Sequence, residues 1–113
     1  MKIYDAYLEL EQKQVDFLNE LLKMNGAEIY DKHGLKRDEN VGYTVQFGNW
    51  MECDINLVVC DEDETPYVDT VLFNNGKEVC CATMEDESFT DGNDPIATFE
   101  YDGDEYRVFL KIV

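Results

Sequence analysis

Every second residue is apolar along two neighbouring stretches in the middle of the chain, residues 41–47 and 51–59. Successive side chains of a β-strand point to opposite faces of a sheet, so this period of two predicts two strands that each bury one face. The residues between them, Gly48 and Asn49, favour a tight turn. The two stretches therefore predict a half-buried β-hairpin.

Similar segments continue toward the C-terminal end of the sequence. Apolar runs are separated by loops or by turn sequences such as Asn74-Asn75-Gly76 and Asp102-Gly103-Asp104. These runs predict four further strands, at residues 67–73, 78–84, 96–101 and 105–113. All six strands are expected to pair in antiparallel fashion, as a meander of hairpins.

Residues 6–25 show a helical period instead. At about 100° per residue, their apolar side chains fall in one broad arc and polar side chains fill the opposite side. Asp5 is the predicted N-cap and Gly26 the predicted C-terminal stop. Residues 27–40 are expected to be a connector that carries the one basic cluster of the sequence, residues 32–37.

Together these segments predict an α+β fold, with one N-terminal amphipathic helix packed on an antiparallel sheet of about six strands. A chain of 113 residues can build one core but not two, so residues 1–113 are expected to form a single domain.

The acidic residues are concentrated in the second half of the chain. The net charge is −17, of which residues 1–50 contribute −3 and residues 51–113 contribute −14. Residues 61–105 hold fifteen acids and one base, Lys77, and the acids lie mostly between the predicted strands. Such a charge repels nucleic acids and anionic membranes and attracts basic surfaces. We therefore expect a basic protein partner, without direct nucleic-acid or membrane binding.

No catalytic signature stands out. Ser88 is the only serine and His33 the only histidine, and the glycines are spread singly among turns rather than grouped in a phosphate-binding loop. The protein is therefore expected not to be an enzyme. Acids at positions 5 and 9 interrupt the apolar run that an export signal requires, and no segment approaches the roughly 20 apolar residues of a membrane span. We expect a cytoplasmic location with reduced cysteines.

The four cysteines allow two interpretations. Tetrahedral zinc would use Cys60 with Cys80 or Cys81, and His33 as a further ligand. However, the spacing lacks a C-x-x-C pair, and alternation points Cys80 and Cys81 to opposite faces while Cys53 joins the apolar face. This pattern favours free thiols and no cofactor.

Aromatic residues are more numerous than one face of a small sheet can bury, which suggests that some anchor a partner. We expect the partner-binding residues to be two such aromatics, Trp50 and Phe89, and three acidic clusters. The first cluster is Asp61, Glu62, Asp63 and Glu64, the second is Glu85, Asp86 and Glu87, and the third is Asp102, Asp104 and Glu105.

In size and in these clusters, the chain resembles small acidic inhibitors of phages and mobile elements, namely anti-restriction DNA mimics and anti-CRISPR proteins. The resemblance implies a non-enzymatic inhibitor, working in a bacterial host cytoplasm. It would occupy the basic nucleic-acid channel of an enzyme such as a CRISPR-associated nuclease and compete with DNA or guide RNA. A second class remains open, a small regulatory, immunity or antitoxin-like partner of a basic bacterial protein.

Overall fold

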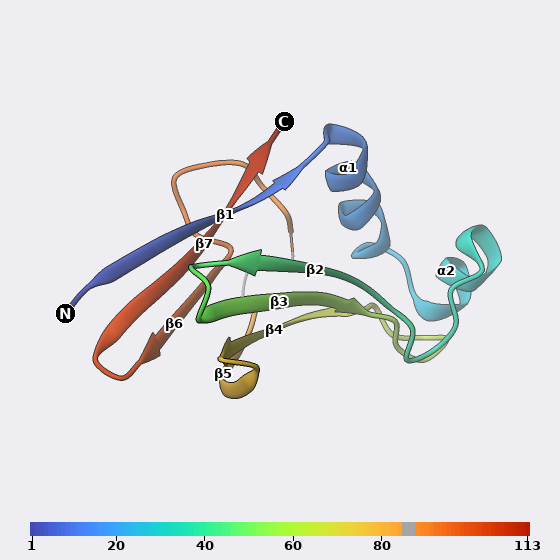
Figure 1. Ribbon diagram of the computed structural model, residues 1–113. Coiled ribbons are helices and arrows are strands. Elements are labelled where there is room, and N and C mark those ends of the chain that lie inside the picture. The colour runs from blue at the N-terminus through green and yellow to red at the C-terminus, as the bar shows by residue number, and fades with distance from the viewer. Residues whose placement is uncertain (85–87) are drawn as a thin grey trace.

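The computed structural model describes residues 1–84 and 88–113. In these residues the chain forms seven strands and two helices (Figure 1): β1 (Ile3–Leu10), α1 (Gln12–Leu21), α2 (Gly26–His33), β2 (Asn40–Gln46), β3 (Met51–Val58), β4 (Tyr67–Asn74), β5 (Lys77–Thr83), β6 (Ala97–Tyr101) and β7 (Asp104–Ile112). The α+β class and the antiparallel hairpins of the prediction are confirmed. The single sheet and the single helix are wrong.

The strands form two sheets. Strands β2, β3, β4 and β5 make a four-stranded antiparallel meander in that order. The second sheet has the order β1-β7-β6, in which β6 and β7 are antiparallel but β1 runs parallel to β7. Strand β1 lies near β2 and β5 lies near β6, so the seven strands surround one core.

The predicted helix at residues 6–25 is wrong in its first part, which is strand β1. Ala6, Leu8 and Leu10 are buried while Tyr7 and Glu9 are exposed, which is the alternation of a strand. Parallel pairing with β7 extends along the whole length of this segment and satisfies the backbone groups on that side of it. Apolar residues in a short segment fit a helical arc and a strand face equally well, and here the long-range pairing determines the outcome.

The helical part of this region begins only after Glu11, which is the N-cap of α1 and forms a capping box with Gln14. Asp5, the predicted N-cap, lies in β1 instead, and Gly26 begins α2 rather than ending a helix. Helix α2 falls in the predicted connector. The Asn25 side chain caps its N-terminus, and Gly34 ends it with a φ of 72°. Among the described residues, no helix is long and apolar enough to cross a membrane.

The six predicted strands correspond to β2–β7 with boundaries shifted by a few residues. Two of their hairpins turn at an Asx-Gly pair in which both residues have positive φ: Asn75 and Gly76 between β4 and β5, and Asp102 and Gly103 between β6 and β7. Such turns match the right-handed twist of the strands that they connect. The turn residues thus place the acidic cluster at residues 102–105 at the tip of a hairpin.

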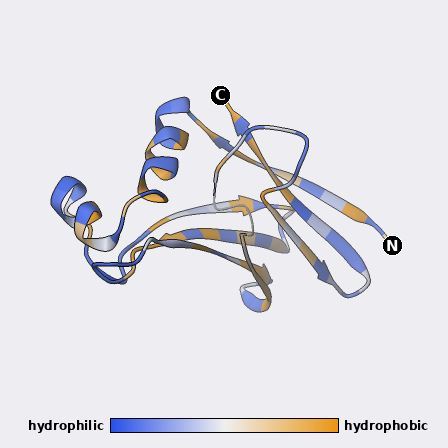
Figure 2. Cartoon of the chain, turned by 180° about the vertical axis from the view of Figure 1, so that it is seen from behind, coloured by the Kyte–Doolittle hydropathy of each residue, from blue (hydrophilic) through white to orange (hydrophobic). Residues whose placement is uncertain are grey.

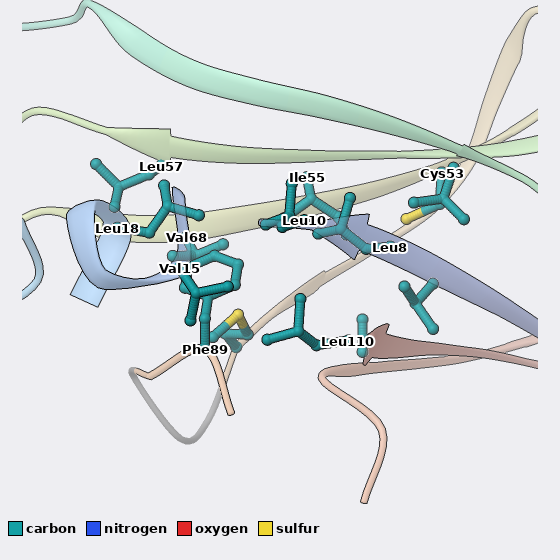
Figure 3. Packing of buried hydrophobic residues seen from close by; sticks show 14 of the residues in the cluster. Leu8, Leu10, Val15, Leu18, Cys53, Ile55, Leu57, Val68, Phe89 and Leu110 are labelled. Atoms are coloured by element: carbon teal, nitrogen blue, oxygen red, sulfur yellow. The ribbon is translucent and has the colours of Figure 1, made fainter. Parts of the chain in front are cut away.

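The core lies between the two sheets and is closed at one end by α1. Apolar and polar residues alternate along the strands (Figure 2), and the apolar positions supply most of the buried residues of the core. Leu18 and Val15 of α1 lie among Leu57, Val68 and Phe89 (Figure 3). The face of the four-stranded sheet that points away from α1 and β1 is left uncovered by either helix (Figure 1).

Candidate protein-binding surface

The acidic loop at residues 61–64 is fastened to the N-terminus of α2. The Gly26 N–H donates to the carbonyl oxygens of Asp61 (3.2 Å) and Glu64 (3.0 Å), and the Ala27 N–H donates to that of Glu62 (3.1 Å). These bonds satisfy N–H groups that a helix leaves unpaired at its first turn. The side chains of Glu62 and Glu64, like that of Asp63, remain exposed, so the loop presents its carboxylates from a fixed backbone.

Asp61 differs from the rest of this loop because it has a basic partner. Its Oδ1 lies 2.9 Å from Nη1 of Arg37, in the connector between α2 and β2. A cavity of about 690 Å³ lies beside this pair and is also lined by Tyr30, Lys36 and Asp63. Its lining holds four acids and two bases, and one of these acids, Asp61, is already paired with Arg37.

The acidic cluster at residues 102–105 lies at the other end of the molecule. The Asp104 carboxylate accepts a hydrogen bond from the backbone N–H of Lys2 (3.0 Å), and the Glu105 N–H donates to the Lys2 carbonyl (2.9 Å). Burial raises the pKa of the neighbouring Tyr106, and the nearby Asp104 and Asp102 carboxylates raise that pKa further. The start of β7 is thus bonded to Lys2, just before β1, and Asp102 in the turn is exposed.

Trp50 lies at the same end as this turn. Its indole packs edge-on against Tyr4 (ring centroids 5.9 Å apart) and Tyr106 (6.1 Å), and 36% of the residue remains exposed. The structure therefore brings together one predicted aromatic anchor and one predicted acidic cluster.

The three predicted acidic clusters do not share one site. Residues 61–64 and residues 102–105 lie at opposite ends of a molecule whose longest dimension is 46 Å (Figures 1 and 2). Glu85, Asp86 and Glu87 lie outside the described residues. The carboxylates are thus distributed along the length of the protein, and a single contact patch would not contain both described clusters.

Phe89 belongs to the core, which corrects its assignment as a surface anchor. It is only 2% exposed and packs beside α1 (Figure 3). The Asn19 side chain fixes its backbone from both sides: Oδ1 accepts from the Phe89 N–H (2.7 Å) and Nδ2 donates to the Phe89 carbonyl (2.9 Å). The sequence around Phe89 is acidic and turn-rich, so it gave no signal that this ring is buried.

The residues considered as zinc ligands are spread over the fold. His33 ends α2, where its ring packs edge-on against Phe17 (5.0 Å) and its Nε2 lies 3.6 Å from Oε2 of Glu20. Cys60 follows β3, and Cys80 and Cys81 lie on β5. Within residues 1–84 and 88–113, no three His, Cys, Asp or Glu side chains converge as metal ligands would.

The cysteines differ strongly in exposure. Cys53 is fully buried, and burial raises the pKa of its thiol to about 12, whereas Cys81 is exposed. Only the thiolate reacts, and at pH 8 a thiol with that pKa is ionised to about one part in ten thousand. We expect a thiol-alkylating reagent to modify Cys81 first and Cys53 only when the protein unfolds.

Peptide mass spectrometry of samples quenched over time would measure these rates, with the Cys81→Ser variant as the control that removes the fast reaction. Modification of Cys53 at the rate of Cys81 in the folded protein would contradict this assignment.

The outer faces of the two sheets were not identified from the sequence as candidate surfaces. The polar residues that alternate with buried apolar residues along the strands do indicate which positions face outward. On the three-stranded sheet both signs of charge occur: the Arg107 guanidinium binds both Asp5 oxygens (2.7 and 2.9 Å) and thereby lowers the pKa of Asp5, whereas Glu100 lies opposite Glu105. Glu9 lies opposite Lys111 in the same sheet. On the four-stranded sheet, the outward side chains include four acids: Glu52, Asp54, Asp69 and Glu78.

The chain matches no protein-family model, and no curated protein or solved structure matches it.

Proposed function

We propose that this protein is a non-enzymatic acidic inhibitor that binds a basic nucleic-acid-binding protein, such as a CRISPR-associated nuclease. Bound to the channel that holds nucleic acid, it competes with DNA or guide RNA. A channel as long as the molecule contacts the acidic loop at residues 61–64 at one end, and the turn at residues 102–105 with Trp50 at the other.

The observation that carries this proposal is the exposure of carboxylates that have no basic partner. In the described part of the chain, no ion pair involves residues 62–64 or residues 102–105. The acids that form ion pairs are Asp5, Glu11, Glu20, Asp38 and Asp61. Unneutralised carboxylates repel one another, and a surface rich in Lys and Arg relieves that repulsion on binding.

The density of charge along the molecule supports the same class of partner. A net charge of −17 divided over 46 Å corresponds to about one charge per 2.7 Å. Duplex DNA carries one negative charge per about 1.7 Å of its axis. The protein therefore has more than half the linear charge density of DNA, with acidic clusters at both ends. A channel that binds a phosphate backbone would attract it at long range.

Neutralising either described cluster is expected to weaken inhibition about tenfold, since each change removes three carboxylates from a contact. One variant carries Glu62→Gln, Asp63→Asn and Glu64→Gln, and the other Asp102→Asn, Asp104→Asn and Glu105→Gln. These near-isosteric changes keep the backbone bonds of the loop and the acceptor for Lys2. The measurement is the concentration that half-inhibits DNA cleavage by purified, guide-loaded CRISPR-associated nucleases, at low and at high salt.

The matched control removes three exposed carboxylates from the N-terminal half, with Glu9→Gln, Asp31→Asn and Glu39→Gln. It changes the net charge by the same amount and is expected to alter inhibition less than about threefold. Equal effects of all three variants would show that net charge alone matters. Unchanged inhibition by both cluster variants would refute the mimicry of nucleic acid. Capture of a basic protein that binds no nucleic acid would favour the immunity or antitoxin-like class.

A further inference from the structure

The outer face of the four-stranded sheet combines exposed apolar and acidic side chains. Strand register places these side chains in cross-strand rows: Asn40, Val58 and Tyr67; Gly42, Asn56 and Asp69; Thr44, Asp54, Val71 and Cys81; and Gln46, Glu52, Phe73 and Glu78. The opposite face of the same strands, which includes Cys53, Ile55 and Leu72, is in the core. We call the outward set the β2–β5 outer face.

Four apolar residues form a stripe on this face, mainly along β4. Tyr67 is 46% exposed, and Val58, Val71 and Phe73 are partly exposed. None of the four packs against the core cluster. An antiparallel sheet with one solvated face normally carries polar side chains there, so an apolar stripe on that face is typical of an interaction surface.

Two of the acids beside the stripe accept hydrogen bonds from neighbouring side chains of the same face. The Thr44 hydroxyl donates to Asp54 (2.8 Å), and Nε2 of Gln46 donates to Glu52 (2.7 Å). The rows of the β2–β5 outer face contain no Lys, Arg or His, and no described ion pair involves their acids. The other sheet differs, because its outer face also carries two bases, Arg107 and Lys111, although Glu100 and Glu105 lie opposite each other there. Of the two outer faces, the β2–β5 outer face is the one whose rows hold acids and no bases, and it is therefore complementary to a basic surface.

A small cavity of about 160 Å³ adjoins the row that contains Glu52 and Phe73. It lies between the β2–β3 turn and the β4–β5 turn. A hydrogen bond joins these two turns: the Asn75 N–H donates to the Trp50 carbonyl (2.8 Å). Its lining has one carboxylate, several amides and an indole, but no basic side chain: Gln46, Asn49, Trp50, Met51, Glu52, Asn75 and Gly76. A carboxylate, amide oxygens and an aromatic ring are the groups that bind a guanidinium or ammonium ion.

We infer that the β2–β5 outer face is the docking surface for the basic partner, and that the cavity beside Trp50 and Glu52 receives one Arg or Lys side chain of that partner. Apolar side chains of the partner cover the stripe from Tyr67 to Phe73, while its basic side chains pair with Asp54 and Asp69. This inference rests on the proposed function and assigns it a surface. Burial of the stripe supplies affinity that does not depend on salt, and the acids select a basic partner.

A short peptide of alternating arginine and valine is a suitable probe, with arginine–serine and glutamate–valine peptides as comparisons. We expect the arginine–valine peptide to shift backbone amide resonances of β3 and β4 and to change the fluorescence of Trp50, the only tryptophan of the chain. The arginine–serine peptide should bind about tenfold more weakly because it cannot cover the stripe, and the glutamate–valine peptide should not bind. Shifts confined to residues 61–64 would overturn the inference.

Glu52→Gln and Glu9→Gln form a matched pair of variants. Each removes one carboxylate from a sheet surface, but Glu9 lies on the other sheet, opposite Lys111. We expect Glu52→Gln to weaken peptide binding about fivefold to tenfold, and Glu9→Gln less than about twofold. Val71→Thr keeps the shape of the stripe and a strand-forming residue but adds a hydroxyl, and is expected to weaken binding about threefold. Circular dichroism would verify that all three variants fold.

The same variants separate this inference from the proposed function when an inhibited nuclease is the ligand. If Glu52→Gln and Glu9→Gln reduce inhibition equally, the docking surface is elsewhere and the proposed function stands. If the peptide binds as expected but no nucleic-acid-binding protein is inhibited, the surface is retained and the proposed function fails.

Discussion

Replacing Phe89 with alanine is expected to lower the free energy of unfolding by about 3–5 kcal/mol, the range for removal of a fully buried aromatic ring. Phe89 fills the space beside α1, where it lies near Val15 and Val68 (Figure 3). Its loss leaves a cavity lined by these side chains. The hydrogen bonds of the Asn19 side chain go to the backbone of residue 89, so the substitution removes the ring but not these two bonds.

Urea denaturation followed by circular dichroism would measure this loss. Phe73→Ala is the matched control, because the same ring is removed from the outward face of β4; a loss of about 1 kcal/mol is expected there. An unchanged midpoint for Phe89→Ala, together with lost partner binding, would mean that Phe89 is a surface anchor and not a core residue.

Replacing Gly26 with alanine is expected to destabilise the protein by about 3 kcal/mol through overpacking. A Cβ at this position would lie 2.3 Å from the Asp61 carbonyl oxygen and 2.6 Å from that of Cys60. Both are backbone atoms, so no side-chain rotation can make room. Either the loop at residues 61–64 or the first turn of α2 must shift, and the bonds that the Gly26 and Ala27 N–H groups donate are strained or lost.

Gly92→Ala is the control for this variant. A Cβ at Gly92 would have no heavy atom within 4 Å, and its backbone does not have positive φ, so the stability should change by less than about 0.5 kcal/mol. Thermal and urea unfolding of the two variants would compare them. Equal stability would contradict the close approach of α2 and the acidic loop.

The strands from residue 40 onward could be predicted because their period of two reflects local burial, and because Asn75-Gly76 and Asp102-Gly103 provide turns that allow few alternatives. Strand β1 could not be predicted in the same way. Its apolar residues precede those of α1 with a spacing that also fits a helical arc, and its partner, β7, is about a hundred residues away in the sequence. Division into two sheets likewise depends on pairings between distant segments.

The candidate surface was predicted in part. The exposed acids at residues 61–64 and the partly exposed Trp50 follow from composition and turn positions, since charged loops and excess aromatics are difficult to bury. The burial of Phe89 and the acidic, apolar outer face of β3 and β4 depend on how the elements pack. A stripe such as Tyr67, Val71 and Phe73 resembles a core face until the structure shows which side of the sheet is covered.

Pairing of the first strand with the last also constrains how the chain reaches its native state. During synthesis the four-stranded meander of β2–β5 emerges in hairpin order, and each of its pairings is local. Strand β1 emerges first and has no partner until β7 is complete, so its pairing carries the largest loop-closure cost of the fold. The three-stranded sheet is therefore completed last, and until then both sides of β1 are free edges.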